Sequence, residues 1–240
     1  MRACLTCADT TGYEDLLDYG YFYYDSGSRG WYTCGLARQA MITFLRANAE
    51  MRVFLDQSWL ESLDAFRDNP SVIGFIVEQM VISQLADNGL SKNSPCLKQA
   101  KVLTFPGNHV ALSPLPGTRL YVPQKFNLKA IDALYTSIEG KVATIVPIQI
   151  TIGTHEDTEK KFFQDWWKWI DPIESRGFTM KTCFLWINRE GGQREEVLED
   201  KRETREVTKV VCPSYTRVFV PIRDVHLDLG TKLDDIKGPA

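Results

Sequence analysis

The sequence predicts an α/β protein in which helices pack around a mixed β-sheet. Apolar stretches with the two-residue period of strands recur between residues 101 and 222, and stretches with helical spacing lie before and among them. From residue 70 to residue 188 their order is helix, strand, strand, strand, helix, strand. The chain has 240 residues, of which 44% are hydrophobic and 25% charged, as is usual for a globular protein. We therefore expect layers of helices and strands around one main core.

Residues 1–55 are expected to form a small extension that resembles a winged helix. Aromatic and β-branched residues flank the turn-rich segment DSGSRG at residues 25–30, which is a hairpin pattern. Helical spacing follows at residues 35–51. This segment is too short to bury a full core, so residues 56–240 are expected to form the main domain.

The main domain begins with two predicted helices. Residues 58–68 form a short amphipathic pattern, and Asn69-Pro70 is a favourable helix start for an apolar helix that stops at Asn88-Gly89. Loop-like sequence after this helix leaves room for a short strand at residues 101–105, which is not counted in the order above. The strands of the main pattern are predicted at residues 120–123, 130–137, 141–153, 179–188 and 215–222. A helix at residues 155–173 is expected to end at Asp171-Pro172. The charged residues 189–209 predict a solvated helix or flexible segment, and the chain is expected to end in a polar tail.

Composition excludes some functions. A formal net charge of -3 argues against a uniformly basic nucleic-acid coat but leaves a local basic cleft open. Cys4 and Cys7 form a C-x-x-C without a second pair, so the six cysteines are expected to be free thiols in a reducing compartment. We find no apolar segment long enough to span a membrane and expect no membrane partner.

Glu78 is a polar residue at a position that helical spacing predicts to be apolar. Its neighbours three and four residues away are Gly74, Phe75, Val81 and Ile82. Removing an ionised carboxylate from water without a partner costs on the order of several kcal/mol. A buried Glu78 therefore needs a cation, a network of hydrogen-bond donors or a raised pKa.

Two neighbouring predicted strands carry three more such residues. Asp132 lies in AIDALYTS, and Gln149 and Thr151 share one face of the following strand, whose other face is entirely apolar. Carboxylate and amide oxygens bind Mg²⁺, which can polarise a phosphate and activate a water molecule. Together with Glu78, these residues are suited to a metal-dependent phosphodiesterase.

This arrangement resembles the PD-(D/E)xK restriction-endonuclease-like superfamily, in which a helix with Glu precedes an Asp strand and a strand with two polar residues at i and i+2. More narrowly, AIDALYTS followed by PIQITIGTH resembles the C-terminal nuclease-like domain of Crinkler effectors and of retrotransposon hot spot proteins. The resemblance covers about residues 57–230. In these families an NTPase with a winged element often precedes the domain, and residues 1–55 look like the end of such a module. No G-x-x-x-x-G-K-[ST] motif occurs in the chain.

The resemblance implies a role for each of five residues. Glu78 would be the helix carboxylate, Asp132 the central metal ligand and Gln149 the second ligand, around Mg²⁺ or Mn²⁺. Thr151 stands where the superfamily usually has Lys, and His155 matches the histidine after the Q-x-T strand. Gln brings no negative charge and Thr no cation, which departs from the family pattern; Lys160 or Lys161 is an alternative source of a cation.

The function implied by the resemblance is that of an effector secreted into a host cell, where it binds and cleaves DNA, or alternatively RNA, in the nucleus. A second reading is a catalytically inactive module of the same fold that binds nucleic acid or a host nuclear protein. A third is a domain that works only with its NTPase partner.

Each site residue also has a structural interpretation. Glu78 can bond a core donor, Asp132 can stabilise a turn, Gln149 and Thr151 can satisfy hydrogen bonds beside the sheet, and His155 can start a helix. The WWKW segment places Trp166 and Trp169 on one helical face, which predicts core packing, with stacking on nucleic-acid bases as the alternative.

Overall fold

The computed structural model describes residues 22–24, 30–32, 60–61, 63–66, 70–91, 95–106, 108–123, 131–153, 158–192, 195–197 and 214–237. These fall into two compact units, one formed by residues 1–76 and 234–240 and the other by residues 77–233. Most of the predicted winged-helix-like extension, Cys4, Cys7 and His155 lie outside the described residues.

The first unit contains the predicted hairpin strands. β1 (Phe22–Tyr24) pairs antiparallel with β2 (Gly30–Tyr32), which confirms this strand pairing. Within the helix predicted at residues 58–68, the structure has the 3-10 helix η1 (Leu63–Phe66).

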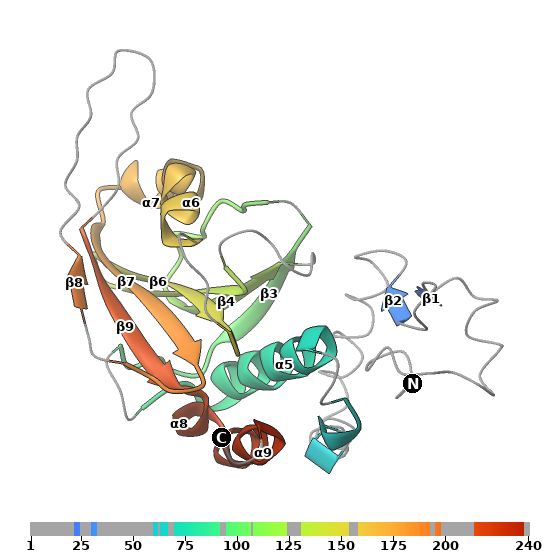
Figure 1. The fold of residues 1–240 in the computed structure, drawn as a ribbon. Coiled ribbons are helices and arrows are strands. Elements are labelled where there is room, and N and C mark those ends of the chain that lie inside the picture. The colour runs from blue at the N-terminus through green and yellow to red at the C-terminus, as the bar shows by residue number, and fades with distance from the viewer. Residues whose placement is uncertain are drawn as a thin grey trace. The chain divides into compact units, whose positions relative to one another are not determined.

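The second unit is built on a seven-stranded mixed sheet with the order β3-β4-β5-β6-β7-β9-β8 (Figure 1). Five strands run in one direction, and β5 and β8 run against them. The strands are β3 (Lys101–Phe105), β4 (Gly117–Pro123), β5 (Ala133–Glu139), β6 (Val142–Ile150), β7 (Thr179–Asn188), β8 (Glu195–Val197) and β9 (Tyr215–Pro221). The predicted α/β class is confirmed. Four strands, β3 to β6, precede the next helix instead of the three in the predicted order, because residues 101–105 add β3.

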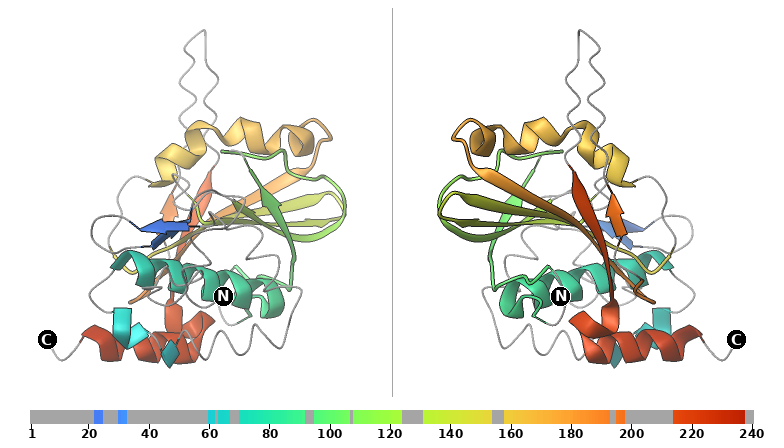
Figure 2. Two further views of the ribbon diagram at one scale, coloured as in Figure 1. Left: turned by 90° about the vertical axis from the view of Figure 1, so that its right-hand side faces the viewer. Right: turned by 90° about the vertical axis from the view of Figure 1, so that its left-hand side faces the viewer.

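Helices cover both faces of this sheet (Figure 2). α6 (Thr158–Gln164) and α7 (Trp166–Glu174) lie on one face. The opposite face is covered by α5 (Pro70–Asn88), from Val77 onward, together with α8 (Ile222–Val225) and α9 (Leu227–Lys237), as far as Leu233. The six residues from Ala133 to Ile138 are all buried because this central strand has a layer on each side.

The predicted boundaries of α5 are confirmed. Pro70 is its first residue, a position where the missing N–H costs no hydrogen bond. Gly89 ends it with φ +67°, and its N–H bonds to Leu85 O at 3.0 Å. A Cβ at Gly89 would lie 2.0 Å from Leu97 O, so both conformation and space require glycine here.

The core between α6–α7 and the sheet is largely aromatic. Trp166 and Trp169 are 1% and 2% exposed, which confirms the predicted core packing of the WWKW segment. Phe105 meets Trp169 edge to face at 5.5 Å, and Phe162 meets Trp166 at 5.7 Å. Trp167 is exposed and lies beside Lys168.

Several predicted elements were wrong in detail. The helix expected at residues 155–173 is two helices that break at Asp165, and α7 continues past Pro172 because proline removes only one helical hydrogen bond and Ser175 N–H still bonds Asp171 O. The charged segment after β7 contributes the edge strand β8. The expected polar tail forms α8 and α9, since Leu229 and Leu233 are buried.

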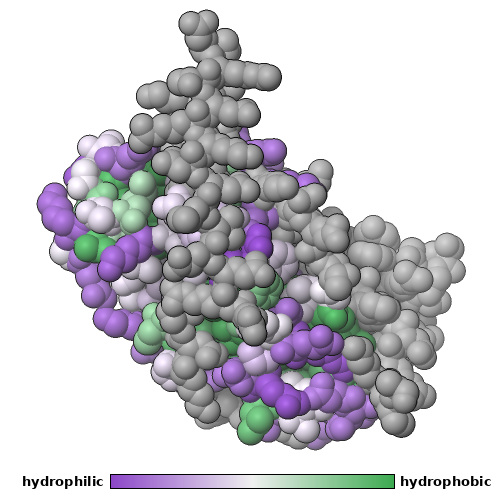
Figure 3. Space-filling model, turned by 60° about the vertical axis from the view of Figure 1, so that its left-hand side comes forward, coloured by the Kyte–Doolittle hydropathy of each residue, from purple (hydrophilic) through white to green (hydrophobic). Residues whose placement is uncertain are grey.

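The face of the second unit that Figure 3 presents is a mixture of hydrophilic and hydrophobic residues. The exposed large apolar side chains among the described residues are Leu115, Trp167 and Leu227. They come from separate segments of the chain, and single residues of this kind are ordinary on protein surfaces. Within the described part of the chain, no helix has both the length and the apolar composition needed to cross a membrane.

Candidate metal site at the carboxyl end of β6

Asp132 and Gln149 meet at one end of the central sheet. Asp132 directly precedes β5, rather than lying within the strand as predicted, and Gln149 is the penultimate residue of β6. Since β5 runs against β6, the start of β5 and the end of β6 share the same edge. The carboxyl ends of parallel strands, which β6 and β7 provide here, are where open α/β sheets usually bind ligands.

The Asp132 carboxylate accepts two hydrogen bonds through one oxygen. Gln149 Nε2 donates to Oδ2 at 2.8 Å, and the backbone N–H of Ile150 donates to the same oxygen at 2.7 Å. Asp132 N–H in turn donates to Ile148 O at 2.9 Å. The side chain therefore continues the β5–β6 hydrogen-bond ladder beyond the last paired residues, and with 7% exposure it is held firmly.

The side-chain oxygen of Gln149 accepts no hydrogen bond from the described residues. Although buried, Gln149 Oε1 has no hydrogen-bond partner among the residues that the structure describes. Exchanging the amide oxygen and nitrogen would turn an acceptor toward the Asp132 carboxylate, so the bond to Asp132 fixes this orientation. A buried acceptor without a partner costs about 1–3 kcal/mol, which a bound cation would offset.

Thr151 lies on the buried side of the turn after β6. Its N–H bonds to Ile187 O at 2.9 Å, which extends the pairing with β7 by one residue. Its hydroxyl donates to Gly153 O at 2.9 Å and accepts from Gly153 N at 3.1 Å. The Thr151 side chain thus closes a local turn.

Glu78 is buried as predicted, with 6% exposure. It accepts a hydrogen bond from Gln79 Nε2 at 3.3 Å. It belongs to α5, whereas Gln149 pairs with Trp186 and so faces the α6–α7 layer. The hydrogen bonds described here join Asp132 and Gln149, and they do not add Glu78 to the pair. His155 lies outside the described residues.

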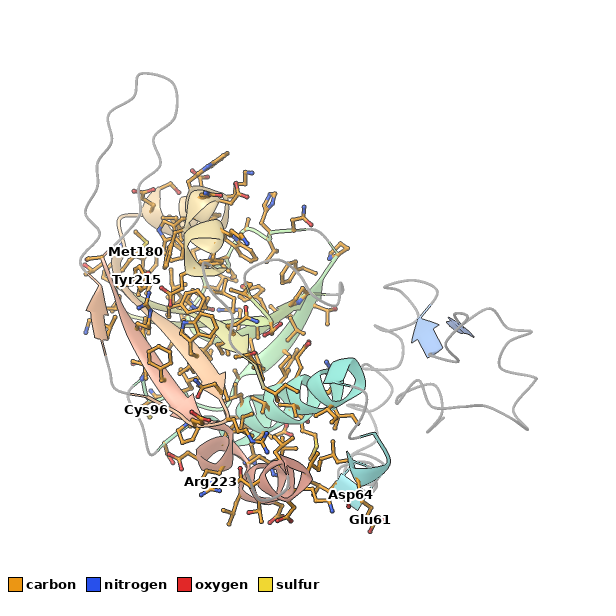
Figure 4. The ribbon with its side chains drawn as sticks, viewed as in Figure 1. Glu61, Asp64, Cys96, Met180, Tyr215 and Arg223 are labelled. Atoms are coloured by element: carbon orange, nitrogen blue, oxygen red, sulfur yellow. The ribbon has the colours of Figure 1, made fainter. Side chains whose placement is uncertain are left out.

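One further buried polar group, Glu159, was not predicted from the sequence. Glu159 in the first turn of α6 is 5% exposed and accepts hydrogen bonds from Trp186 Nε1 and Tyr215 OH, each at 2.5 Å. Arg217 adds two bonds, from Nε to Oε1 and from Nη2 to Oε2, each at 2.7 Å. Tyr215 is at the start of β9 (Figure 4). The sequence did contain a signal for this group. Arg217 lies on the same strand face as Tyr215 and Phe219, and a charged residue between two aromatic residues on one face indicates a partner of opposite charge.

Opposing effects act on the pKa of Glu159. Burial raises it, whereas the hydrogen bonds from Arg217, Trp186 and Tyr215 and the charge of Arg217 lower it, and the net pKa lies below the ordinary value. Glu159 is therefore an ionised anchor between α6 and the sheet. Its oxygens are occupied by donors, which makes it a structural group rather than a metal ligand.

The Asp132–Gln149 pair is the arrangement best suited to a hard cation, because it offers a carboxylate and an orphaned amide oxygen. Among the described residues, no cluster of three or more His, Cys, Asp or Glu side chains could hold a metal ion. Comparisons with known proteins give no match to a protein-family model, a curated protein or a solved structure.

Proposed function

We propose that the chain is a divalent-metal-dependent phosphodiesterase of the PD-(D/E)xK type that binds and cleaves DNA. The observation that supports this function is that Gln149 Oε1, on the side chain that donates to the Asp132 carboxylate, is buried without a hydrogen-bond partner in the described part of the chain. The order α5, β3, β4, β5, β6, α6, α7, β7 forms an α/β core, which is compatible with the resemblance to Crinkler-type nuclease-like domains. By the same resemblance, a host nucleus is the proposed place of action.

Each group of the site would have a distinct task. Asp132 and Gln149 would hold Mg²⁺ or Mn²⁺. The resemblance also assigns Glu78, whose helix α5 covers the sheet face opposite to the one that Gln149 faces, and His155, which lies outside the described residues. The bound metal would polarise the phosphate and activate a water molecule. Ile150 N–H and Gln149 Nε2 orient the Asp132 carboxylate, and both belong to a strand paired on its two sides, so this ligand would be fixed before substrate arrives.

The test is cleavage of plasmid DNA with Mg²⁺ or Mn²⁺, with a chelator as control. Asp132→Asn is the informative variant, because its amide oxygen can still accept from Ile150 N–H and Gln149 Nε2 while the charge is lost. Asp171→Asn, an exposed change on α7, is the matched control. We expect Asp132→Asn to reduce nicking by more than about a hundredfold, beyond the effect of an outer-sphere group. Equal nicking by the two variants would contradict the proposed site.

A second function is favoured by Thr151. Its hydroxyl is engaged by Gly153, and no amine stands at the position where the resembled superfamily usually has Lys. The chain would then be a catalytically inactive module that binds nucleic acid or a host protein. Binding of fluorescently labelled DNA in the presence of chelator, with no nicking under either metal, would support this function and contradict the first.

A further inference from the structure

Basic side chains gather at the edge of the sheet opposite the Asp132–Gln149 pair. β3, β4, β6 and β7 run in the same direction, so their amino ends share one edge. Thr179 N–H donates to Lys141 O at 2.8 Å, which joins the β5–β6 turn to the start of β7. We call this edge the amino rim, and its basic residues are Lys101, Arg119, Lys141, Arg176 and Lys181. All of them except the half-buried Arg119 are exposed.

The positive charge of the amino rim is largely uncompensated. Within the described part of the chain, no carboxylate forms an ion pair with these cations. Glu139 and Glu174 also lie at this edge, but Glu139 is already paired with Lys98 at 2.7 Å. The rim is therefore locally positive in a chain whose formal net charge is -3.

An exposed apolar side chain lies beside two of these cations. Arg119 Nη1 donates to Leu115 O at 2.7 Å and Nη2 donates to Pro116 O at 3.3 Å, so the guanidinium holds the loop before β4 in place. Arg119 also pairs with Lys101 across β3 and β4. Leu115 itself is 60% exposed. A fixed apolar residue surrounded by charged residues is the composition of an anchor and its polar surround in a protein interface.

We propose that the amino rim binds an extended acidic segment of a partner protein, with an apolar side chain of that segment packed against Leu115. Neighbouring strands lie about 4.8 Å apart, so the rim spans about 19 Å from β3 to β7, a length that about six residues of extended chain cover. Carboxylates along the segment would pair with the cations. The inference goes beyond the proposed catalysis, because the rim and the Asp132–Gln149 pair lie at opposite ends of the strands.

A nucleic acid suits the amino rim less well than an acidic protein segment does. Phosphate groups would pair with the cations but would leave Leu115 without an apolar partner. Single-strand sites also use exposed aromatic side chains on which bases stack. At the rim, Phe178 is half-buried and Lys141 Nζ lies 5.4 Å from the centre of its ring, whereas the exposed Trp167 belongs to the start of α7.

The experiment measures the fluorescence anisotropy of a fluorescein-labelled EDELEDE peptide titrated with the full chain at low ionic strength. Lys101→Gln combined with Arg176→Gln removes charge from both ends of the rim. The matched control combines Lys161→Gln with Arg223→Gln, which removes the same charge from exposed positions on α6 and α8. We expect the rim variant to bind the peptide at least about fivefold more weakly than the wild type, and the control less than about twofold more weakly.

Leu115→Ser tests the apolar contact separately from the charges. A second peptide, EDESEDE, has serine in place of the leucine. We expect Leu115→Ser to weaken binding of EDELEDE at least about threefold and to leave the affinity for EDESEDE unchanged, because the two apolar groups act as a pair.

Absence of peptide binding by the wild type would overturn the inference. Equal weakening in the rim and control variants would do the same, as would an equal effect of Leu115→Ser on both peptides. A DNA duplex that binds through the rim cations when the peptides do not would assign the rim to nucleic acid instead. Circular dichroism verifies folding; if Leu115→Ser does not fold, the charge variants decide alone. Plasmid nicking by the rim variant should equal that of the wild type, so nicking without peptide binding contradicts only this inference, and peptide binding without nicking contradicts only the proposed catalysis.

Discussion

Arg217 on β9 donates two hydrogen bonds to the Glu159 carboxylate, from Nε to Oε1 and from Nη2 to Oε2, each at 2.7 Å. The pair links the first turn of α6 to a strand 58 residues later in the chain. The Glu159 side chain is 6% exposed and that of Arg217 30%, so solvent screens the bond only in part. This bond fixes α6, and with it the layer that Gln149 faces.

Removing Arg217 would leave the Glu159 charge buried without its cation. We expect Arg217→Met to lower the free energy of unfolding by about 3 kcal/mol, as is typical when one partner of a buried pair is lost. The measurement is urea denaturation followed by tryptophan fluorescence. The control is Lys98→Met, which breaks the exposed Lys98–Glu139 pair and should lower the free energy of unfolding far less than Arg217→Met does. Equal losses in the two variants would show that Arg217 contributes only as a surface residue.

The lowered pKa of Glu159 predicts acid sensitivity. Because the pKa is lower in the folded than in the unfolded chain, the carboxylate stabilises the fold fully above its ordinary value of 4.5, and this contribution is lost as pH falls through the folded pKa. The measurement is urea denaturation of the wild type and of Glu159→Gln between about pH 6 and pH 3, the window of this linkage. We expect the free energy of unfolding to fall less steeply with decreasing pH in the variant than in the wild type. Glu174→Gln, an exposed change on α7, should decline as the wild type does.

His226 predicts a second pH effect near neutrality. It precedes α9, and its Nδ1 accepts the N–H of Leu229 at 3.3 Å, which requires a neutral ring. Burial lowers the pKa of His226, and Asp228 raises it in part. The pKa of His226 in the folded chain is below the ordinary value of 6.5. The stability that neutral His226 contributes is therefore fully present above pH 6.5 and decreases as the pH falls below that value.

His226→Asn keeps a capping side chain but removes the titration. We expect its thermal unfolding temperature to change less between pH 7.5 and pH 5.5 (roughly the range around the ordinary His pKa) than that of the wild type. His109→Asn, at an exposed position, is the control and should retain the wild-type pH dependence. A wild-type pH dependence in His226→Asn would assign the effect to another group.

Gly230 marks a close approach within the C-terminal helices. A Cβ there would lie 2.4 Å from Arg223 Cβ and 2.6 Å from Arg223 Cα (Arg223 is labelled in Figure 4). We expect Gly230→Ala to destabilise by about 1–3 kcal/mol through overpacking. Gly74→Ala, in α5 with open space around the added carbon, should instead stabilise by about 0.5–1 kcal/mol. Urea denaturation distinguishes the two signs, and destabilisation by both would contradict the role given to space.

Local patterns were sufficient for most elements of the sheet and for α5. β7 matches the predicted bounds of residues 179–188, and Pro70 and Gly89 delimit α5 because each imposes its effect on its own backbone. Trp166 and Trp169 were placed in the core by helical spacing alone. These predictions succeed since period and backbone preference are properties of neighbouring residues.

Sequence patterns predicted the burial of Glu78, Asp132 and Thr151, because each has apolar neighbours at the spacing of its helix or strand, but they did not predict the burial of Glu159. The contacts of Asp132 and Glu159 depend on segments that are distant in the sequence. The fold joins Asp132 to Gln149 and to Ile150 N–H, and it leaves Gln149 Oε1 with no partner among the described residues. It also pairs the buried Glu159 with Arg217. It also turned the expected polar tail into α8 and α9. The spacing of apolar residues along the chain indicates whether a side chain points into the core or toward solvent. Its hydrogen-bond partner usually belongs to a distant segment, which comes within reach only when the sheet has folded.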